Sequence, residues 1–492
     1  MKRSYQRKEF IQLLSALGAG WVLSSCDQHP VNSQQTVSKD TLPQKADEAI
    51  EQFNSGNAVY VKRDNEQYDT LRRGFNKRIE KYPAVIAVCK NTDGVAEAIR
   101  YARKNKLKVA VKSGGHSIEG FCVNDGGLVV YLGLMNKIEW VHETYVKLQP
   151  ACRLADIHNE LLPKGKLIPS GSCGSVGIGG LALGGGYGFF CRSMGLTCDS
   201  LQEVTIVDGY GQIHSSRHDR DLLWACRGGG NGNFGIVTEM VFVTHTAPKT
   251  FTSHRFKSFK VDVPRAKNLL ERWFAITADL QETCFSAFVL NGKTIMILVT
   301  NFGEHSPELQ KKLDDLSALS DKTALGNPHS LAGALKPFYG ADHPVYFRNA
   351  CAGMYNGFES VAACIEDVME KVTTTPGMIY QVNTFGGKVK DTELGKASCF
   401  AHRSYSYLSE LQSYWEQPTQ EEKLHQTFDA IQELFAQNGI DAHYCNYPDI
   451  KFKNPQLAYY GKNYGQLQVI KGKYDADDVI QHEQSVRLIT KR

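Results

Sequence analysis

The chain has 492 residues, of which 42% are apolar and 22% are charged. This length is enough for two domains with substantial cores, and the composition is that of a globular protein. The formal net charge is only +4 and no cluster of Lys and Arg dominates one segment, which argues against a nucleic-acid-binding protein. None of the 13 cysteines forms a C-x-x-C pair, so the spacing predicts no metal site.

Residues 1–26 predict a lipoprotein-type signal peptide. Basic residues precede an apolar stretch over residues 10–23, an order typical of an export signal, and the stretch is too short for a comfortable membrane span. Residues 23–26 read Leu-Ser-Ser-Cys and resemble a bacterial lipobox, which would make Cys26 a lipid anchor on the periplasmic or extracellular face of a bacterial envelope. An ordinary secretory signal with an incidental cysteine is the alternative.

A polar segment, residues 27–75, is expected to be a tether, and an α/β pattern follows it over residues 76–250. Helices are expected at residues 94–106, with Asp93 as the N-cap, and at residues 153–162. Strands are expected at residues 82–89, 107–112, 128–132, 138–148, 201–207 and 234–245. These residues are predicted to form the first domain.

Residues 251–440 have a different pattern, which predicts a second domain. Amphipathic helices are expected at residues 266–280 and 420–437, and Ser306-Pro307 is a typical helix start. Asn291-Gly292 between two apolar runs indicates a β-hairpin with a type I′ turn. We therefore expect an α+β fold, with an antiparallel sheet that carries helices on one face. The C-terminal segment, residues 441–492, is expected to return to the first domain.

Two glycine-rich loops each carry one nucleophilic side chain. Residues 112–117 read Lys-Ser-Gly-Gly-His-Ser and contain His116, and residues 171–177 read Gly-Ser-Cys-Gly-Ser-Val-Gly and contain Cys173. Glycine lets backbone N–H groups approach a pyrophosphate that a Cβ would hold away. The spacing is not the G-x-G-x-x-G of a nicotinamide site, and apolar side chains between the later glycines argue against a flexible linker. The two loops therefore predict a flavin held at two points.

These motifs resemble those of the berberine-bridge-enzyme-like oxidases, within the FAD superfamily that includes vanillyl-alcohol oxidase. Besides the two loops, the resemblance is carried by Gly184-Gly-Gly-Tyr-Gly, by the run from Asp221 to Thr238, by Tyr444-Cys-Asn-Tyr and by Tyr459-Tyr-Gly-Lys-Asn. The resemblance implies a PCMH-type FAD-binding domain with two subdomains and a substrate domain built on an antiparallel sheet. It also implies an FAD that is joined covalently to both His116 and Cys173.

The resemblance assigns roles at the site. His116 would bond the 8α-methyl carbon of the flavin and Cys173 would bond ring carbon 6. Val176 would stand where the family controls the access of oxygen, and Tyr187 would face the substrate side of the ring. The full set of cofactor-binding residues that the resemblance implies is Lys112, Ser113, Gly114, Gly115, His116, Ser117, Gly171, Cys173, Val176, Gly177, Gly179, Gly180, Gly184, Tyr187, Gly188, Val237, Tyr460 and Asn463.

The resemblance places the catalytic base among the tyrosines near residue 445. Alternate residues of a regular strand share a face, so Tyr444 and Tyr447, three positions apart, would point opposite ways, and we favour Tyr447. Asn383 stands where family members often have an acid that activates this tyrosine. One neutral hydrogen bond supplies about 1 kcal/mol, whereas lowering a tyrosine pKa from about 10 to about 7 takes about 4 kcal/mol. Asn383 therefore predicts a base that works only at higher pH or one assisted by another group, and the cations near it in sequence are Lys388, Lys390 and Arg403.

Three functions are compatible with the sequence. The first is an exported FAD-dependent oxidase that removes a hydride from an alcohol, with the anomeric hydroxyl of a sugar or oligosaccharide as the expected substrate and O2 reduced to H2O2. The second is a flavin oxidase or dehydrogenase that tailors a secondary metabolite. The third is a non-catalytic flavin-fold lipoprotein that binds a ligand. The presence of both expected anchors and both tyrosines argues against the third, so we expect the oxidase.

Overall fold

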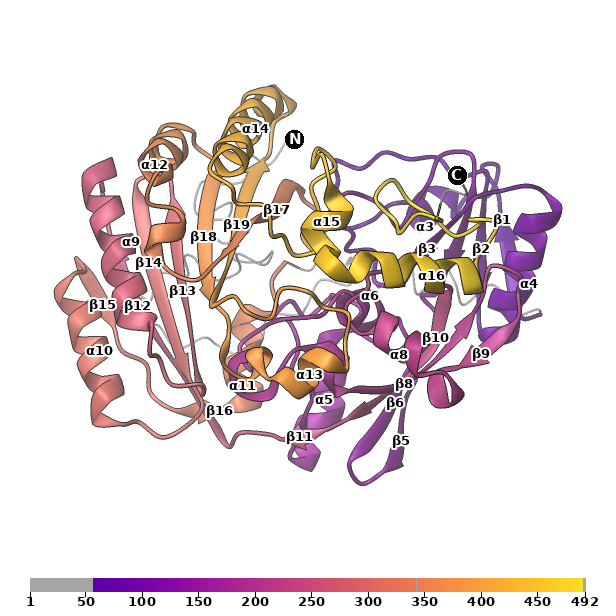
Figure 1. The fold of residues 1–492 in the computed structure, drawn as a ribbon, viewed down its shortest axis with the longest axis horizontal. Helices are drawn as coiled ribbons and strands as arrows, with labels where there is room; N and C mark the ends of the chain where they lie inside the picture. Colours follow the sequence, from indigo (N-terminus) through magenta and orange to yellow (C-terminus); the bar gives the residue numbers. More distant parts are fainter. Residues whose placement is uncertain (1–55, 342, 490–492) are drawn as a thin grey trace.

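The computed structural model describes residues 56–341 and 343–489 (Figure 1). The predicted signal peptide and Cys26 lie outside the described residues. In the described part of the chain, no helix combines the length and the apolar character that a membrane crossing needs. The fold is α+β, as predicted from the sequence, with one mixed sheet and further antiparallel sheets.

The first sheet is covered by helix α4 (Thr92–Lys104), which packs Val95 and Ile99 against it. The side chain of Asn91 accepts the N–H of Gly94 at the start of this helix, so Asn91 is the N-cap in place of the predicted Asp93. The central strands pair in parallel and β1 pairs antiparallel to them. The strand order is β1 (Ala58–Val61), β2 (Val85–Cys89), β4 (Leu128–Tyr131) and β3 (Val109–Lys112).

Part of the predicted tether is folded. Strand β1 and helix α3 (Tyr68–Arg72) both fall within residues 27–75. β1 pairs with β2, and Tyr68 and Leu71 are buried against the first sheet. The prediction of a tether is therefore wrong for residues 58–72. A few buried apolar side chains, Val61, Tyr68 and Leu71, are enough to attach this segment to the sheet, although its overall composition is polar.

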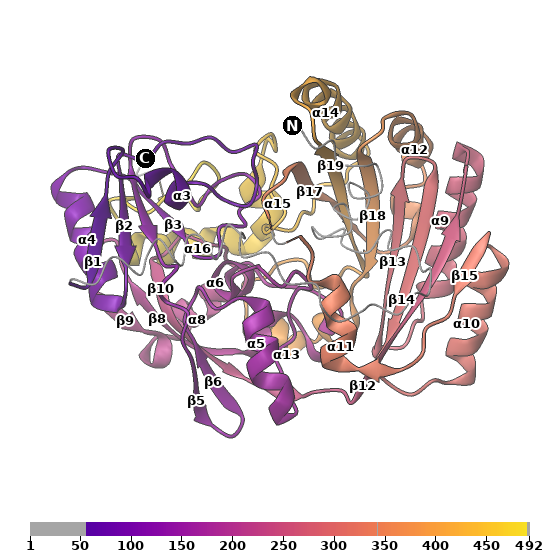
Figure 2. The ribbon, with the colours of Figure 1, turned by 180° about the vertical axis from the view of Figure 1, so that it is seen from behind.

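The second sheet is antiparallel throughout, and the single strand predicted over residues 138–148 is in fact a hairpin. Its order is β5 (Ile138–His142), β6 (Tyr145–Leu148), β10 (Ile236–Val243), β8 (Leu201–Val207) and β9 (Ile213–Ser215). The helices that share its apolar core include α5 (Leu154–Leu161), α8 (Arg220–Cys226) and α16 (Tyr464–Tyr474). Helix α16 belongs to the C-terminal segment, which lies along the first domain in both ribbon views (Figures 1 and 2).

The largest sheet belongs to the middle of the chain and is antiparallel. Its order is β15 (Lys322–Ala324), β12 (Thr250–Ser258), β14 (Thr294–Asn301), β13 (Cys284–Asn291), β18 (Met378–Thr384), β19 (Tyr407–Trp415) and β17 (Tyr346–Tyr355), and β16 (His329–Ser330) pairs with β12. The helices on its outer face are α9 (Val263–Thr277), α10 (Pro307–Ala318), α12 (Ile365–Thr374) and α14 (Glu421–Gln437) (Figure 1).

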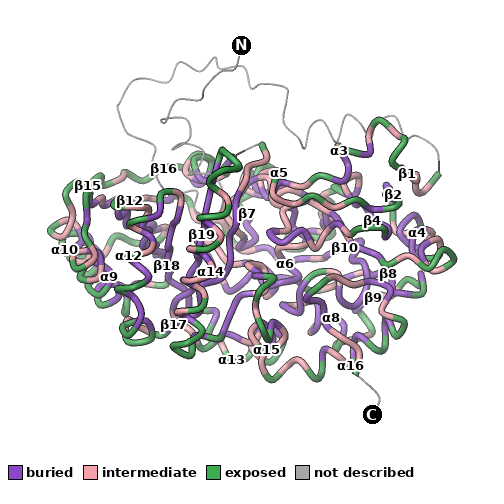
Figure 3. Tube along the Cα trace, turned by 90° about the horizontal axis from the view of Figure 1, so that it is seen from above, coloured by how far each residue is buried: buried purple, intermediate pink, exposed green. Residues whose placement is uncertain are grey.

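The inner face of the largest sheet packs against the first domain. Phe285 of β13 and Phe347 of β17 share an apolar cluster with Phe75 and Phe189. Because both faces are covered, every residue of β18 and β19 is buried, and the strands form the purple interior of Figure 3. The inner face is therefore placed to contribute side chains to a site between the two domains.

Short elements connect these layers. Helix α6 (Ile178–Leu183) follows the second glycine-rich loop directly, and α15 (Pro455–Tyr460) follows the Tyr444 motif. The others are α7 (Cys191–Met194), α11 (Leu331–Leu335), α13 (Thr392–Lys396), β7 (Lys166–Leu167) and β11 (His245–Thr246).

Candidate active site

A cavity lies between the two glycine-rich loops and the inner face of the largest sheet, and both His116 and Cys173 line it. The predicted site residues in its wall are Ser113, Gly114, Gly115, His116, Ser117, Gly171, Cys173, Val176, Gly177, Gly179, Gly180, Tyr187, Gly188, Val237, Asn383, Tyr444, Tyr447 and Tyr460. The predicted residues that are not in its wall are Lys112, Gly184 and Asn463.

Two of those three residues support the wall from behind. Lys112 is buried, and its Nζ donates to the backbone carbonyls of Leu71 and Arg73, which ties helix α3 to the His116 loop. Burial lowers the pKa of Lys112 to about 8. Asn463 donates to the carbonyl of Cys399 at 3.0 Å. These side chains hold the backbone that forms the cavity.

The two glycine-rich loops cross in direct backbone contact. A Cβ added to Gly114 would lie 2.5 Å from the backbone nitrogen of Gly177, so only glycine allows this approach. Gly115 has a φ of +72°, a left-handed conformation that other residues rarely adopt. The glycines therefore bring the loop of His116 and the loop of Cys173 together at one end of the cavity.

The two expected anchors are half-buried, in different surroundings. The ring of His116 stacks on Phe75, with 4.2 Å between the ring centroids and an angle of 20°. Burial lowers the pKa of His116 to about 4, so its imidazole is neutral at physiological pH. Burial raises the pKa of the Cys173 thiol, and a contact with Ser175, 3.6 Å between Sγ and Oγ, opposes this effect.

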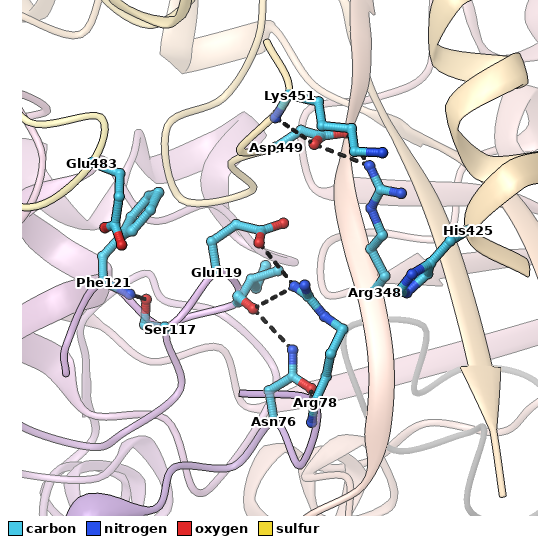
Figure 4. Close-up of polar contacts among 12 residues, drawn as sticks. Asn76, Arg78, Ser117, Glu119, Phe121, Arg348, His425, Asp449, Lys451 and Glu483 are labelled. Atoms are coloured by element: carbon cyan, nitrogen blue, oxygen red, sulfur yellow. Dashed lines mark hydrogen bonds and ion pairs between the residues drawn. The ribbon is translucent and has the colours of Figure 1, made fainter. Parts of the chain in front are cut away.

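Buried ion pairs hold the His116 loop, the largest sheet and the C-terminal segment in place (Figure 4). Arg78 donates to Glu119, next to the loop, at 2.9 Å. Arg348 of β17 pairs with Asp449 of the C-terminal segment at 3.0 Å, and these two side chains are only 4% and 1% exposed. Breaking a buried pair of this kind costs about 3–5 kcal/mol, so the residues after the His116 loop are held to Arg78, and the largest sheet is held to the C-terminal segment.

Tyr187 and Tyr447 meet on the side of the cavity formed by the sheet. The Tyr447 hydroxyl donates to the Tyr187 hydroxyl at 3.3 Å, and the Tyr187 hydroxyl donates to Oε1 of Glu410 at 2.6 Å. Asn383 donates to both neighbours, at 3.1 Å to the Tyr187 hydroxyl and at 2.9 Å to Oε1 of Glu410. A continuous chain of hydrogen bonds therefore runs from Tyr447 to a carboxylate.

Glu410 is the functional residue that sequence reasoning missed. It is fully buried in β19, and burial raises the pKa of its carboxyl to about 7. Its hydrogen-bond donors are Tyr187, Asn349, Asn383 and Gln412. Burial and then the charge of Glu410 raise the pKa values of Tyr187 and Tyr447 well above 10. Glu410, and not a tyrosine, is thus the group that changes its protonation near neutral pH.

The register of the sheet explains how Glu410 reaches this site. Gln381 of β18 lies opposite Glu410 of β19, which brings the carboxylate to Asn383 on the neighbouring strand. The ionisable group that contacts both Asn383 and Tyr187 is therefore a carboxylate and not a cation. The cations near Asn383 in sequence are engaged elsewhere: Lys388 with Asp391, Lys390 with Ser406 and Arg403 with Asp199.

Tyr444 and Tyr447 do not point apart, so the expectation based on a regular strand is wrong. Residues 444–447 form a turn, in which the Tyr447 N–H donates to the Tyr444 carbonyl at 3.0 Å. The two rings lie 5.2 Å apart, at 85°. The Tyr444 hydroxyl accepts the N–H of Gly186 at 2.8 Å and the amide of Asn446 at 2.9 Å. These contacts make Tyr444 a support for the glycine-rich backbone, whereas Tyr447 faces Tyr187.

The two sides of the cavity fit a flavin and its substrate. One side is glycine backbone with a neutral imidazole and a thiol, which suits close contact with a flat ring and its phosphates. The other side presents tyrosine hydroxyls and amides around a carboxylate that can take a proton. Fold and site together define a flavin-dependent oxidoreductase.

Comparisons with known protein families support this class. The sequence model described as "FAD binding domain" matches residues 83–217, and the one described as "Berberine and berberine like" matches residues 443–487. The FAD-linked oxidoreductase dpmaF of Metarhizium anisopliae is 30% identical over 451 residues, which cover 84% of this chain and 86% of the relative. The chain therefore belongs to the berberine-bridge-enzyme-like FAD-linked oxidases, and it is an FAD-dependent oxidoreductase.

Other relatives match over similar lengths. The FAD-linked oxidoreductase YvdP of Bacillus subtilis is 29% identical, over 85% of this chain and 95% of the relative. The glucooligosaccharide oxidase of Sarocladium strictum is 28% identical, over 87% of this chain and 91% of the relative. The solved structure of a chitooligosaccharide oxidase has a TM-score of 0.79 and 23% identity, over 90% of this chain and all of that one, which establishes the PCMH-type fold.

Proposed function

We propose that this protein is an FAD-dependent oxidase that oxidises the anomeric hydroxyl of a sugar or oligosaccharide and reduces O2 to H2O2. The observation that carries the proposal is the hydrogen bond of 2.6 Å between Tyr187, in the wall of the cavity, and the carboxylate of Glu410, which is buried behind that wall. Similarity to a glucooligosaccharide oxidase and to a chitooligosaccharide oxidase supports the choice of substrate. FAD, when bound, supplies the oxidant that accepts the hydride from the substrate carbon.

The protein contributes proton transfer and orientation. A substrate hydroxyl placed at Tyr447 or Tyr187 can pass its proton along the hydrogen bonds to Glu410, since each tyrosine gives up one proton as it receives another. The tyrosines stay neutral, which agrees with the raised pKa values of both. Glu410 is ionised above pH 7, so the rate is expected to rise with pH through about 7.

Amide side chains support a polar, hydroxyl-rich substrate. Asn349 and Gln381 line the cavity beside Asn383, and Asn349 is only 3% exposed. Asn349 donates to Oε2 of Glu410 at 3.2 Å, while its Oδ1 has no hydrogen-bond partner within the described residues. A buried carbonyl oxygen without a partner costs about 1–3 kcal/mol, and a substrate hydroxyl could satisfy it. This arrangement favours a sugar over an apolar substrate.

We also propose that the FAD is bicovalent, through His116 and Cys173. The position of both side chains in the wall of one cavity supports this, as does the neutral imidazole. Acid precipitation of the purified protein tests the attachment: the protein pellet should stay yellow. Cys173→Ala should retain FAD through His116 alone and turn over more slowly, whereas normal turnover would argue against the second bond. His116→Ala tests the bond between His116 and the flavin in the same way.

The reaction itself is tested with a panel of sugars and oligosaccharides and detection of peroxide. Peroxide formed in proportion to an oxidised sugar supports the oxidase. Turnover on a dye acceptor but not on O2 would indicate a dehydrogenase instead. Failure of every sugar, with reduction of the flavin by another alcohol, would move the substrate to a different class.

We further propose that the protein is exported and anchored by a lipid at Cys26. The basic residues, the apolar stretch and the Leu-Ser-Ser-Cys sequence over residues 1–26 support this. The full chain should fractionate with membranes, and Cys26→Ser should release it without loss of activity. Recovery of the unchanged full chain in the cytosolic fraction would exclude both export and the anchor.

A further inference from the structure

Ser175 lies between the two side chains that are expected to hold FAD. Its hydroxyl oxygen is 3.6 Å from Sγ of Cys173. Its main chain lies beside the ring of His116 and acts to raise the pKa of that imidazole, against the larger effect of burial. One residue therefore contacts both expected anchors, through its side chain on one side and its main chain on the other.

The loop that carries Ser175 is fixed from two directions. On the side of the substrate domain, the N–H of Gly174 donates to the carbonyl of Tyr339 at 2.9 Å, and a Cβ on Gly174 would lie 2.8 Å from the ring of Tyr339. On the other side, the first N–H groups of α5 donate to the loop, from Leu154 to the Val176 carbonyl and from Ala155 to the Gly174 carbonyl, both at 3.0 Å. The geometry at Ser175 is thus set by contacts that do not involve either anchor.

The same loop offsets part of the effect of burial on the thiol of Cys173. Burial raises the pKa of Cys173, while the hydroxyl of Ser175 and the N–H groups of Ser175 and Val176 lower it. A thiolate, not a thiol, is the nucleophile in cysteine chemistry. Donors around the sulfur are therefore needed at a site where burial alone would keep the thiol protonated.

The main chain of Ser175 and the ring of Phe75 together confine the imidazole. Stacking on Phe75, at 4.2 Å, restricts rotation of the ring. A neutral imidazole has one ring nitrogen with a lone pair, and this is the atom that can form a new bond. His116 is thereby held in one orientation.

We propose that Ser175 is a positioning residue for the attachment of FAD, and that it directs Cys173 through its hydroxyl and His116 through its backbone. The inference rests on the bicovalent attachment proposed above. In each attachment, a bond forms from the protein atom to a flavin carbon. The proton of the nucleophile and a hydrogen of that carbon leave with two electrons, and O2 takes these up as H2O2. The hydroxyl acts only on the bond to Cys173, so the two attachments can be separated by mutation.

The experiment compares Ser175→Ala with the wild type as full chains produced in flavin-starved cells. FAD is added to each, and the fractions of the Cys173 peptide and of the His116 peptide that carry flavin mass are followed over time by mass spectrometry. Loss of the hydroxyl should slow attachment at Cys173 about tenfold, because the hydrogen bond to the charged sulfur no longer stabilises the thiolate. The rate of attachment at His116 should not change. Ser193→Ala, at a serine outside the wall of the cavity, is the matched control and should behave as the wild type.

A second pair of variants separates the hydroxyl from packing. Ser175→Thr keeps the hydroxyl and should attach flavin to Cys173 at nearly the wild-type rate, whereas Ser175→Val has the same shape without it and should be slow. Attachment at the wild-type rate in both Ser175→Ala and Ser175→Val would overturn the role of Ser175. If the wild type carries no flavin on Cys173 at all, the bicovalent attachment itself is wrong and the inference is overturned with it.

Discussion

The two walls of the cavity are built by different means. The wall for FAD is made of backbone, from glycine-rich loops that are short and continuous in sequence, and its shape depends on the absence of side chains at Gly114 and Gly177. The wall for the substrate is made of side chains from separate strands and a C-terminal turn, joined by the hydrogen bonds around Glu410. The first wall is built from residues close together in sequence, whereas the second depends on contacts between strands that are far apart in sequence. Changes to the first should affect cofactor loading, and changes to the second should affect the chemical step.

The largest effect is expected from Glu410→Gln, which removes the proton acceptor and keeps the shape of the side chain. The rate of flavin reduction by substrate should fall about 10²–10⁴-fold, the usual contribution of a positioned general base. The FAD content should stay at the wild-type level, because Glu410 lies behind Tyr187 and Asn383 and not beside the glycine-rich loops. Stopped-flow measurement of flavin reduction checks this, with Glu416→Gln, an exposed residue just after the same strand, as the control. A wild-type rate in Glu410→Gln would show that the carboxylate takes no part.

Gly114→Ala tests the backbone wall. The new Cβ would lie 2.5 Å from the Gly177 nitrogen, so the loops must separate, at a cost in the free energy of unfolding of about 1–3 kcal/mol. A lower melting temperature and loss of bound FAD are expected. The control is Gly472→Ala in α16, where no atom lies within 4 Å of the added Cβ and the melting temperature should rise slightly. Full FAD loading in Gly114→Ala would mean that the close approach of the loops is not required.

Asn383→Asp tests how the side chain at position 383 affects the ionisation of Glu410. The new carboxylate would stand in place of an amide that donates to Glu410 at 2.9 Å, and two like charges at this distance disfavour ionisation of both. The rising limb of the pH–rate profile should therefore move to higher pH, by about one pH unit or more. Asn383→Ala removes the hydrogen-bond donor without adding a charge, so it should move the rising limb of the pH–rate profile by less. A shift toward lower pH would contradict the role assigned to Glu410.

The smallest effect is expected from Tyr444→Phe, although Tyr444 shares its motif with Tyr447. Removal of the hydroxyl leaves the Gly186 N–H without its partner and should lower the free energy of unfolding by about 1 kcal/mol. The rate of flavin reduction should change by less than about threefold, because this hydroxyl does not belong to the chain that ends at Glu410. Tyr447→Phe is the matched variant and should be far slower. An equal loss of rate in Tyr444→Phe and Tyr447→Phe would mean that Tyr447 is not the tyrosine that alone accepts the substrate proton.

The sequence predicted the backbone wall better than the substrate wall. His116 and Cys173 could be found because each lies in a short glycine-rich motif whose chemistry can be read locally. Glu410 could not, because it lies in a strand without any motif, and its contact with Asn383 depends on the register in which Gln381 lies opposite it. The one available signal was its position as the only charged residue in Tyr407–Trp415, where every residue is buried.

Two expectations failed for related reasons. Tyr444 and Tyr447 were expected on a regular strand, but Asn446 and Pro448 accompany a turn, and the alternation rule does not hold in a turn. Residues 58–72 were expected in a tether because their average composition is polar. Their burial depends on a few positions, such as Tyr68 and Leu71, that an average does not reveal.

The central claim is that Glu410 receives the substrate proton through Tyr187. It is tested most directly by the rate of flavin reduction, measured in single turnovers without O2, as a function of pH in the wild type and in Glu410→Gln. Burial raises the pKa of Glu410 to about 7, so the wild-type rate should rise with pH and reach half its maximum near this value. In Glu410→Gln the rate should be at least about a hundredfold lower and this limb should be absent. The same limb in Glu410→Gln, at a rate close to that of the wild type, would contradict the account.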